Sequence, residues 1–437
     1  MPPRAKADKA AGSAKRPRNG DASSCLPSPM APSWATGVSR SIRAAGGVRI
    51  GMPAMGLGTF RAKGEKLSSA VHHALLRGVR LIDTAEGYKN AADIHAGLMR
   101  AAEVVPMDDV FIVTKVSKDS MTPAGVRRCV EEQSKLLFGV APAPVAAQSA
   151  LSGEESAAVP SSSRRRSVPL DLVLLHWPGT ANANPTSAAH AKARRDCYAE
   201  LFRLKSLGAC RSVGVSNFTV AHLEELLEDG RRWAATVEGG ASDRADVTAR
   251  GYLPAVNQVE MHPYHPQEEL ARWCRAHDVV VQAYTSLGRA DEPPRCLYGN
   301  WEPARPKLMV EPVVIRIARE SVTRLPTGSL PPTAAQVLLA WALAKGYAVV
   351  PKSVSPAHID ENIGVPSALV SALQDDEVVP GVEGEGSLSP PPQPQPWRQL
   401  LDQLGVKGPS VATAPELARH NLPGRITYAY VIDKIPK

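Results

Sequence analysis

Residues 110–139 contain the run VFIVTKV (110–116) and, after a short interval, the run PAGVRRCVEEQSKLLFG (123–139). The first run is short, rich in β-branched residues and almost continuously apolar, which is typical of a strand buried on both faces of a parallel sheet. The second has apolar residues three and four positions apart and ends at a glycine, as amphipathic helices commonly do. The segment therefore predicts a strand followed by a helix, the repeating unit of α/β folds.

The same unit recurs along the chain. Apolar, β-branched runs also occur at 55–59, 79–84, 170–177, 210–217, 255–261, 279–287 and 348–353. Helical patterns lie between or after them at 65–78, 193–208, 222–230, 267–278 and 333–346. Eight strands, each followed by helical sequence, predict an α/β protein with a closed (β/α)8 TIM barrel. An open doubly wound sheet is the alternative, because alternation alone does not establish closure.

Composition divides the 437 residues into three parts. Residues 1–48 hold eight Lys/Arg against two acidic residues and are rich in Ala, Ser and Pro, so we expect a disordered basic N-terminal extension. This extension could be a dispensable tail, an organelle transit peptide or, at 14–18, a nuclear signal. We expect residues 49–375 to form the barrel and 376–437 to form a divergent C-terminal region with a low-complexity insertion.

Three stretches interrupt the strand–helix pattern without adding apolar residues for a core. Because each is polar or rich in Ala, Pro and Ser, we expect loop insertions at 141–167, 232–251 and 376–396. Beyond the last of them, we expect a single helix at 396–404.

Charge and cysteine content restrict the partners and the compartment. The formal net charge is +8, but six of these charges belong to the extension, so the balanced remainder argues against nucleic-acid binding. The six cysteines form no CxxC pair, which favours free thiols in a reducing compartment. No apolar run approaches the roughly 18 residues of a membrane span. We therefore expect a cytoplasmic protein without membrane or nucleic-acid partners, and a monomer.

Polar side chains stand at the carboxyl ends of the predicted strands or just beyond them. In a barrel these ends meet at one face, and buried polar groups are costly unless they contact each other. We therefore expect a site built from Asp83, Tyr88, Lys115, His176, Ser216, Asn217, Gln258, Glu260, Tyr284, Lys352 and Ser353.

Four of these residues suit proton transfer to a carbonyl oxygen. The ordinary pKa of tyrosine, near ~10, makes it a weak acid at neutral pH, and a neighbouring cation lowers that pKa. We expect Lys115 to supply this charge to Tyr88, with Asp83 holding the ammonium group and His176 orienting the substrate oxygen. The sequence contains no GxGxxG followed by a helix, no phosphate loop and no HExxH or paired-cysteine motif, which disfavours Rossmann, P-loop and metal sites.

From Met52 to about Gly364 the chain resembles the aldo-keto reductases, in the motifs GLGTF, RLIDTAEGYKN, TKV, LVLLHWP, RSVGVSNF, AVNQVEMHPYHPQEEL, AYTSLGR, AQVLLAWAL and VVPKSVSPAHIDEN. The resemblance implies an NADP(H)-dependent oxidoreductase of the aldehyde reductase or alcohol dehydrogenase type that reduces small aldehydes or ketones to alcohols. It implies a catalytic tetrad of Asp83, Tyr88, Lys115 and His176. The implied cofactor residues are Gly58, Thr59, Ser216, Asn217, Gln258, Tyr284, Thr285, Leu287, Lys352, Ser353, His358, Glu361 and Asn362.

The resemblance also suggests roles within this set. Tyr284 would stack on the nicotinamide, and Ser216, Asn217 and Gln258 would hold its carboxamide. The substrate would be lined by Phe60, His176, Trp177 and the long loop at 289–310. An alternative that the resemblance leaves open is a non-catalytic NADP(H)-binding sensor barrel, like the β subunits of potassium channels. A nucleic-acid tether formed by the basic extension is a third reading.

The chain departs from the family pattern at four places. His358 stands where the family usually has arginine, and an imidazole titrates near neutrality, so the preference for NADPH should depend on pH. The usual YSPLG is YTSLG, the 289–310 loop is long, and the region beyond residue 366 lacks the family's ending. The long 289–310 loop and the region beyond residue 366 correspond to the parts of the family that enclose substrate and cofactor.

Overall fold

The computed structural model describes residues 37–139, 170–181, 183–184, 187–237, 250–288 and 307–374. Neighbouring strands of its main sheet all pair in parallel, in the order β10-β9-β8-β7-β6-β5-β4-β3. Parallel bridges Met55↔Val349 and Gly58↔Lys352 join the first and last strands, so the sheet closes on itself. The predicted (β/α)8 barrel is confirmed, and the open sheet is wrong. The strands are β3 (Leu57–Gly58), β4 (Leu81–Asp83), β5 (Phe111–Val116), β6 (Leu170–Leu175), β7 (Cys210–Ser216), β8 (Val256–Glu260), β9 (Val280–Tyr284) and β10 (Ala348–Val349).

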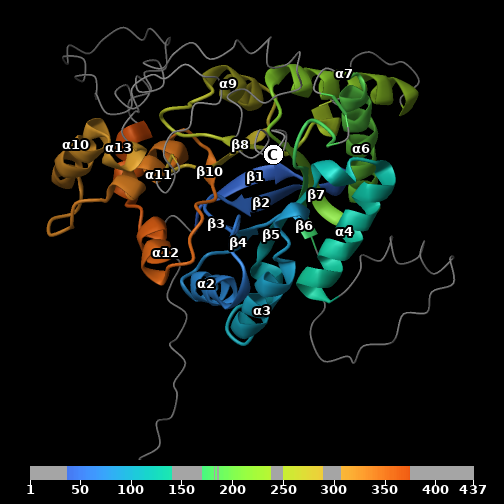
Figure 1. Cartoon of the computed structure of the whole chain (residues 1–437). Coiled ribbons are helices and arrows are strands. Elements are labelled where there is room, and N and C mark those ends of the chain that lie inside the picture. The colour runs from blue at the N-terminus through green and yellow to red at the C-terminus, as the bar shows by residue number, and fades with distance from the viewer. Residues whose placement is uncertain are drawn as a thin grey trace, which may run out of the picture.

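Helices surround the strands (Figure 1). Helix α4 shows why such segments begin and end where they do. The Thr122 hydroxyl accepts a hydrogen bond from the backbone of Gly125, Pro123 occupies the first turn, and Gly139 ends the helix at φ 74°. The helices are α2 (Gly64–Leu76), α3 (Ala91–Ala101), α4 (Pro123–Phe138), α6 (Ala189–Ser206), α7 (Val220–Val237), α9 (Glu268–Ala276), α10 (Pro312–Glu320), α11 (Ala334–Ala344), α12 (Pro356–Ile363) and α13 (Ser367–Gln374).

Side chains along each strand alternate between the barrel interior and the helical layer. In β5, Phe111 and Val113 belong to the interior cluster, whereas Ile112 and Val116 pack in the cluster that contains the helices. Since the side-chain period of a strand is two, Lys115 continues the inward row of Phe111 and Val113. The same count directs inward Asp83, His176, Ser216, Gln258, Tyr284 and Lys352.

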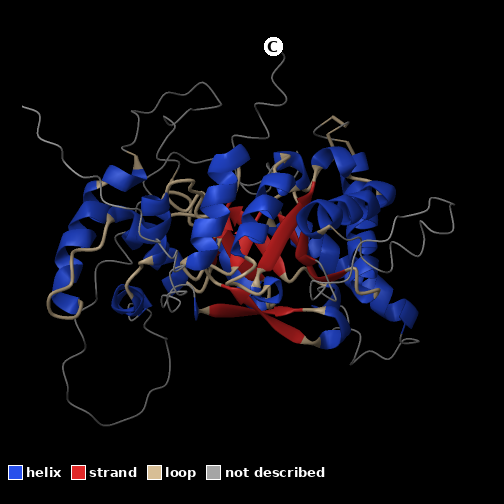
Figure 2. Cartoon of the chain, turned by 90° about the horizontal axis from the view of Figure 1, so that it is seen from below, coloured by secondary structure: helices blue, strands red, loops and turns tan. Residues whose placement is uncertain are grey.

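An antiparallel hairpin lies at the amino-terminal end of the barrel strands (Figure 2). It consists of β1 (Ser39–Arg43) and β2 (Arg49–Pro53), and its residues Ile42 and Met52 join the interior cluster. The expected disorder of residues 1–48 is therefore wrong for 37–48, while 1–36 lie outside the described residues. Only alternate residues of this hairpin face apolar surroundings, so its sequence is polar overall. Its few apolar side chains form a pattern only in relation to the barrel end that they cover.

Other differences concern element boundaries. Helix α7 continues through Gly230 to Val237, so the expected stop at the glycine is wrong, and so is the expected 232–251 loop over residues 232–237. Residues 238–249 of that loop lie outside the described residues. Arg232 pairs with Glu228 one turn earlier at 3.3 Å, which supports the added turns. The seventh barrel strand ends at Tyr284 rather than 287, because Thr285 adopts a left-handed φ of 54°. Helices were expected after every strand, but no residue ranges were predicted for α3, α10, α12 and α13.

Several expectations lie outside the described residues: the insertions at 141–167 and 376–396, the helix at 396–404 and the loop residues 289–306. Within the described ranges, no helix is long and apolar enough to cross a membrane. The described cysteines, Cys129, Cys197, Cys210 and Cys274, are buried free thiols.

Candidate active site

Lys115 lies at the centre of a buried polar group at the carboxyl ends of the strands. Its Nζ donates to both carboxylate oxygens of Asp83 and to the carbonyl of Thr84, each at 2.8 Å. The same ammonium lies 3.5 Å from the Tyr88 hydroxyl and 5.0 Å from the centre of its ring. Lys115 is 0% exposed and Asp83 4%, so the pair is shielded from solvent. The sequence-based placement of these three side chains next to one another is thus what the structure shows.

The pKa of Tyr88 differs from the value expected beside a lysine. Burial, followed by the negative charge of Asp83, raises the pKa of Tyr88 well above its ordinary value. Burial lowers the pKa of Lys115, and Asp83 opposes that change. The expectation that Lys115 lowers the pKa of Tyr88 is therefore wrong in direction: desolvation outweighs the cation, which Asp83 largely neutralises. Tyr88 consequently keeps its proton at neutral pH, as a proton donor must.

His176 follows β6 and faces the same space as Tyr88. Its ring centre lies 5.7 Å from that of Tyr88 in an edge-on arrangement and 5.8 Å from that of Trp177 in a stacked one. Burial, and then the charges of Lys115 and Lys118, hold the pKa of His176 well below its ordinary value. The ring is therefore neutral at physiological pH, and one of its nitrogens can donate a hydrogen bond without carrying a charge.

Polar groups from β7, β8 and β9 are joined beside this centre. The Ser216 hydroxyl donates to the carbonyl of Gln258 at 2.7 Å, and the Asn217 amide donates to the Ser216 hydroxyl at 3.1 Å and to the His176 carbonyl at 3.0 Å. The Tyr284 hydroxyl donates to the Asn217 side-chain oxygen at 2.8 Å. Asn217 has a left-handed φ of 63°, a conformation that asparagine tolerates better than most residues. These bonds fix the orientation of each group in advance.

Gln258 connects this cluster to the acid–base centre. Its Nε2 donates to Asp83 Oδ1 at 2.7 Å and to the buried Gln282 Oε1 at 2.6 Å. Both N–H groups of the amide are thereby used within the protein. What remains for a ligand is the amide oxygen, which can only accept hydrogen bonds.

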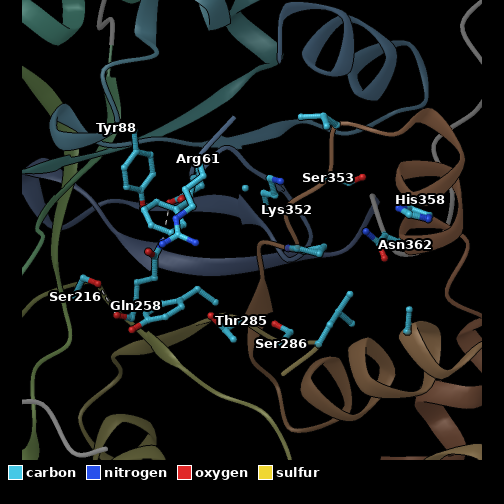
Figure 3. A pocket seen from close by; sticks show the side chains of 18 of the residues that line it. Arg61, Tyr88, Ser216, Gln258, Thr285, Ser286, Lys352, Ser353, His358 and Asn362 are labelled. Carbon is cyan, nitrogen blue, oxygen red and sulfur yellow. Dashed lines mark hydrogen bonds between the residues drawn. The ribbon is translucent and has the colours of Figure 1, made fainter. Parts of the chain in front are cut away.

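A cavity of about 650 Å³ runs along the carboxyl ends of the strands. Tyr88, Ser216 and Gln258 lie toward one end, and Ser353, His358 and Asn362 lie at the other (Figure 3). Of the residues expected to bind substrate or cofactor, those that line it are Gly58, Phe60, Asp83, Tyr88, His176, Trp177, Ser216, Asn217, Gln258, Tyr284, Thr285, Leu287, Lys352, Ser353, His358, Glu361 and Asn362.

Three expected site residues do not line the cavity. Glu260 lies 3.1 Å from His262 Nε2 instead. Lys115 lies behind Asp83 and Tyr88, and Thr59 is fully buried with its hydroxyl donating to the Asp83 carbonyl at 2.8 Å. Thr59 therefore supports Asp83 rather than facing a ligand. Met309, from the expected 289–310 loop, also lines the cavity. Residues that line it and were not expected are Arg61, Ser286, Ala335, Pro351, Val354 and Ser355. Most of these residues are next in sequence to an expected site residue, namely Phe60, Thr285, Lys352 or Ser353, and this adjacency could have predicted them.

Gly58 lines the cavity between Asp83 and Lys352, the residues with which it pairs on the two neighbouring strands. A side-chain carbon there would lie 2.6 Å from the Val350 carbonyl, so only glycine fits. Lys352 and His358 are exposed, and Ser353 accepts a hydrogen bond from the backbone of Ser355 at 3.1 Å just before α12 begins. Cations next to a helix N-terminus favour an anionic ligand. In the described part of the chain, no three metal-ligating side chains are grouped to hold an ion.

Known proteins resemble this chain over most of its length. An aldo/keto reductase of Synechocystis, slr0942, is 30% identical over 322 residues, which cover 71% of this chain and 80% of that protein. Aldo-keto reductase family 1 member A1 of Sus scrofa is 30% identical, over 72% of this chain and 81% of its own. Methylglyoxal reductase DkgA of Yersinia pestis is 27% identical, over 72% and 83%.

Solved structures agree on the fold. The crystal structure of an aldo/keto reductase from Brucella melitensis superposes with a TM-score of 0.52 at 23% identity, covering 76% of this chain and 98% of that one. The aldose reductase of Schistosoma japonicum gives 0.52 at 24% identity, covering 78% and 92%. The sequence model of the Aldo/keto reductase family matches residues 49–140 and 157–378. The chain belongs to the aldo/keto reductase family.

Proposed function

We propose that this protein is an NADP(H)-dependent reductase of small aldehydes and ketones. Family membership supports an oxidoreductase that acts on small carbonyl compounds with a nicotinamide cofactor. The observation that carries the finer proposal is the contact of the Tyr88 hydroxyl with the ammonium of Lys115, which Asp83 holds at 2.8 Å, on the wall of a cavity. We expect the protein to act as a monomer in the cytoplasm, where buried free thiols remain reduced.

The chemistry follows from what each side chain can hold or move. When bound, the nicotinamide supplies a hydride to the carbonyl carbon. Tyr88 donates the proton that the carbonyl oxygen needs, because its raised pKa keeps the phenol protonated until the far more basic alkoxide develops. Lys115 stabilises the tyrosinate that remains, and Asp83 keeps the lysine in place. Neutral His176 donates a hydrogen bond that orients the oxygen toward Tyr88.

The residues present fit a nicotinamide dinucleotide. At the catalytic end, Tyr284 presents an aromatic face and Gln258 presents an amide oxygen that can accept from a carboxamide. At the far end, Lys352 offers a cation, and Ser353 and His358 offer hydrogen-bonding side chains, to an additional phosphate. The positive charge at the far end supports NADP(H) over NAD(H), because NAD(H) lacks the additional phosphate with which this charge would pair.

The substrate end is mostly apolar and aromatic. Phe60 packs on Tyr88 with ring centres 5.1 Å apart, and Trp177 stacks on His176 with ring centres 5.8 Å apart. Such a wall favours apolar or aromatic aldehydes, whose rings can stack there. A sensor barrel that binds NADP(H) without turnover is disfavoured, because it has no need of the buried Asp83–Lys115 pair next to a tyrosine.

Tyr88→Phe tests the proposal. The change removes the proton donor and keeps the ring, so turnover of a simple aldehyde should fall by about 10²–10⁴-fold. The NADPH dissociation constant, measured by fluorescence titration, should stay close to that of the wild type. Near-native turnover by this variant would refute the assignment of the acid. No oxidation of NADPH by the wild type with any of a panel of aldehydes and ketones would favour the sensor barrel.

A further inference from the structure

Tyr88 belongs to a short turn that has few hydrogen bonds of its own. The turn η2 (Glu86–Tyr88) is held by Tyr88 N–H to the Ala85 carbonyl at 3.0 Å and by Lys89 N–H to the Glu86 carbonyl at 3.4 Å. Lys89 then takes a left-handed φ of 52°, which is unfavourable for a lysine. The contact between Tyr88 and Lys115, at 3.5 Å, is at the outer limit of a hydrogen bond. A small displacement of the turn would therefore break it.

The side chain of Glu86 fastens this turn to the strand that carries Lys115. Its Oε2 accepts from the backbone N–H of Ser117 at 2.8 Å, and its Oε1 accepts from the Ser120 hydroxyl at 2.7 Å. Glu86 is two residues from Tyr88, and Ser117 is two residues from Lys115. The bond thus joins the backbone beside the proton donor to the backbone beside its lysine.

The Glu86 carboxylate is costly to bury at this place. Glu86 is only 7% exposed, and both donors are neutral groups. Burying a charge beside neutral donors costs more than burying an amide. A carboxylate nevertheless offers two acceptor oxygens, one for each donor, whereas glutamine would turn an NH₂ group toward one of them. Burial, and then the charge of Glu86, raises the pKa of Cys129, so this thiol adds no second negative charge.

The segment that Glu86 contacts also supports the loop of His176. The Lys118 carbonyl accepts from Ala181 N–H at 3.1 Å, and His176 N–H donates to the Val116 carbonyl at 3.1 Å. The turn η4 (Lys118–Ser120) therefore lies between the segments that present the two side chains expected to contact the substrate oxygen. Fixing η2 to this turn fixes Tyr88 relative to both Lys115 and His176.

We propose that Glu86 is a positioning residue for proton transfer, holding Tyr88 against Lys115 through its hydrogen bonds to Ser117 and Ser120. This inference rests on the proposed reductase function. Glu86 does not line the cavity, so it acts through Tyr88 and not by touching substrate or cofactor. Its loss should therefore lower kcat and leave cofactor affinity nearly unchanged.

The test compares Glu86→Gln with Glu132→Gln, a matched control at an exposed position of α4. Misplacing a reacting group by about 1 Å can cost on the order of 10²-fold, so Glu86→Gln should lower kcat by roughly 10- to 100-fold. Ser120→Ala, which removes one of the two donors, should lower kcat less. The NADPH dissociation constant should hardly change in any of them. An independent readout is the NMR signal of the Tyr88 ζ carbon, identified by its loss in Tyr88→Phe, which should shift in Glu86→Gln but not in the control.

A lower melting temperature with unchanged kcat and an unmoved Tyr88 signal would make Glu86 merely structural and overturn the proposal. A fall in kcat with an unmoved signal would overturn it as well, because the effect would then not pass through Tyr88. If the wild type turned over no carbonyl compound, the reductase function would fail separately. In that case the Tyr88 signal alone would still decide whether Glu86 positions the ring.

Discussion

Replacing Lys115 by methionine should destabilise the protein because it leaves the Asp83 carboxylate buried without a cation. The lysine now donates at 2.8 Å to both oxygens of a carboxylate in a residue that is only 4% exposed. Removing one partner of a buried ion pair typically costs about 3–5 kcal/mol. Gln258 still donates to Asp83 at 2.7 Å, and methionine fills most of the lysine stem, so we expect a loss near the lower end, about 3 kcal/mol.

Urea unfolding of Lys115→Met, Asp83→Asn and the double variant measures this loss. The double variant should regain most of the stability, since it removes both charges, which gives a coupling energy of roughly 2 kcal/mol or more. A double variant no more stable than Lys115→Met would refute the reasoning, because the loss would then come from packing and not from the unpaired charge.

Two further predictions concern groups away from the tetrad. His358→Arg should tighten NADPH binding relative to NADH, because a guanidinium is a permanent cation that can bind a phosphate through two hydrogen bonds; equal dissociation constants for NADPH in both proteins would mean that residue 358 does not face the phosphate. Lys205→Met should stabilise the protein by roughly 1–3 kcal/mol at neutral pH, because burial lowers the pKa of Lys205 from 10.5 to about 8 and so opposes its charged form. That gain should fade as pH rises from about 8 toward 10.5, since the folded wild type loses the proton before the unfolded chain does, and a gain that persists at the higher pH in urea titrations would contradict it.

The barrel and the composition of its site were predictable from local patterns. Each strand is a short apolar run, and the two-residue period of its side chains carries Asp83, Lys115 and Gln258 inward along with the apolar residues before them. Because parallel strands present the same end to one face, residues far apart in sequence had to meet once the strands were known. The hairpin at 39–53 was not predicted from the sequence. Its apolar residues lie on one side only, and they are buried because that side covers the open end of the barrel.

The sequence by itself therefore determined the strands and which polar residues stand at their carboxyl ends, because these depend on local periodicity and on the order of elements. The closure of the sheet was decided by the tertiary structure, in the bridges Met55↔Val349 and Gly58↔Lys352. Only the tertiary structure decided the electrostatics of the site. The pKa of Tyr88 is raised first by its burial and then by Asp83, and the extent of burial is not encoded in any motif. The bond from Ser117 N–H to the Glu86 carboxylate joins the segments that follow two different strands at 2.8 Å, and the bond from Gln258 to Asp83 joins two strands at 2.7 Å. Such distances depend on how the whole barrel packs, and interactions between buried charges and dipoles vary too steeply with distance to be inferred from sequence spacing.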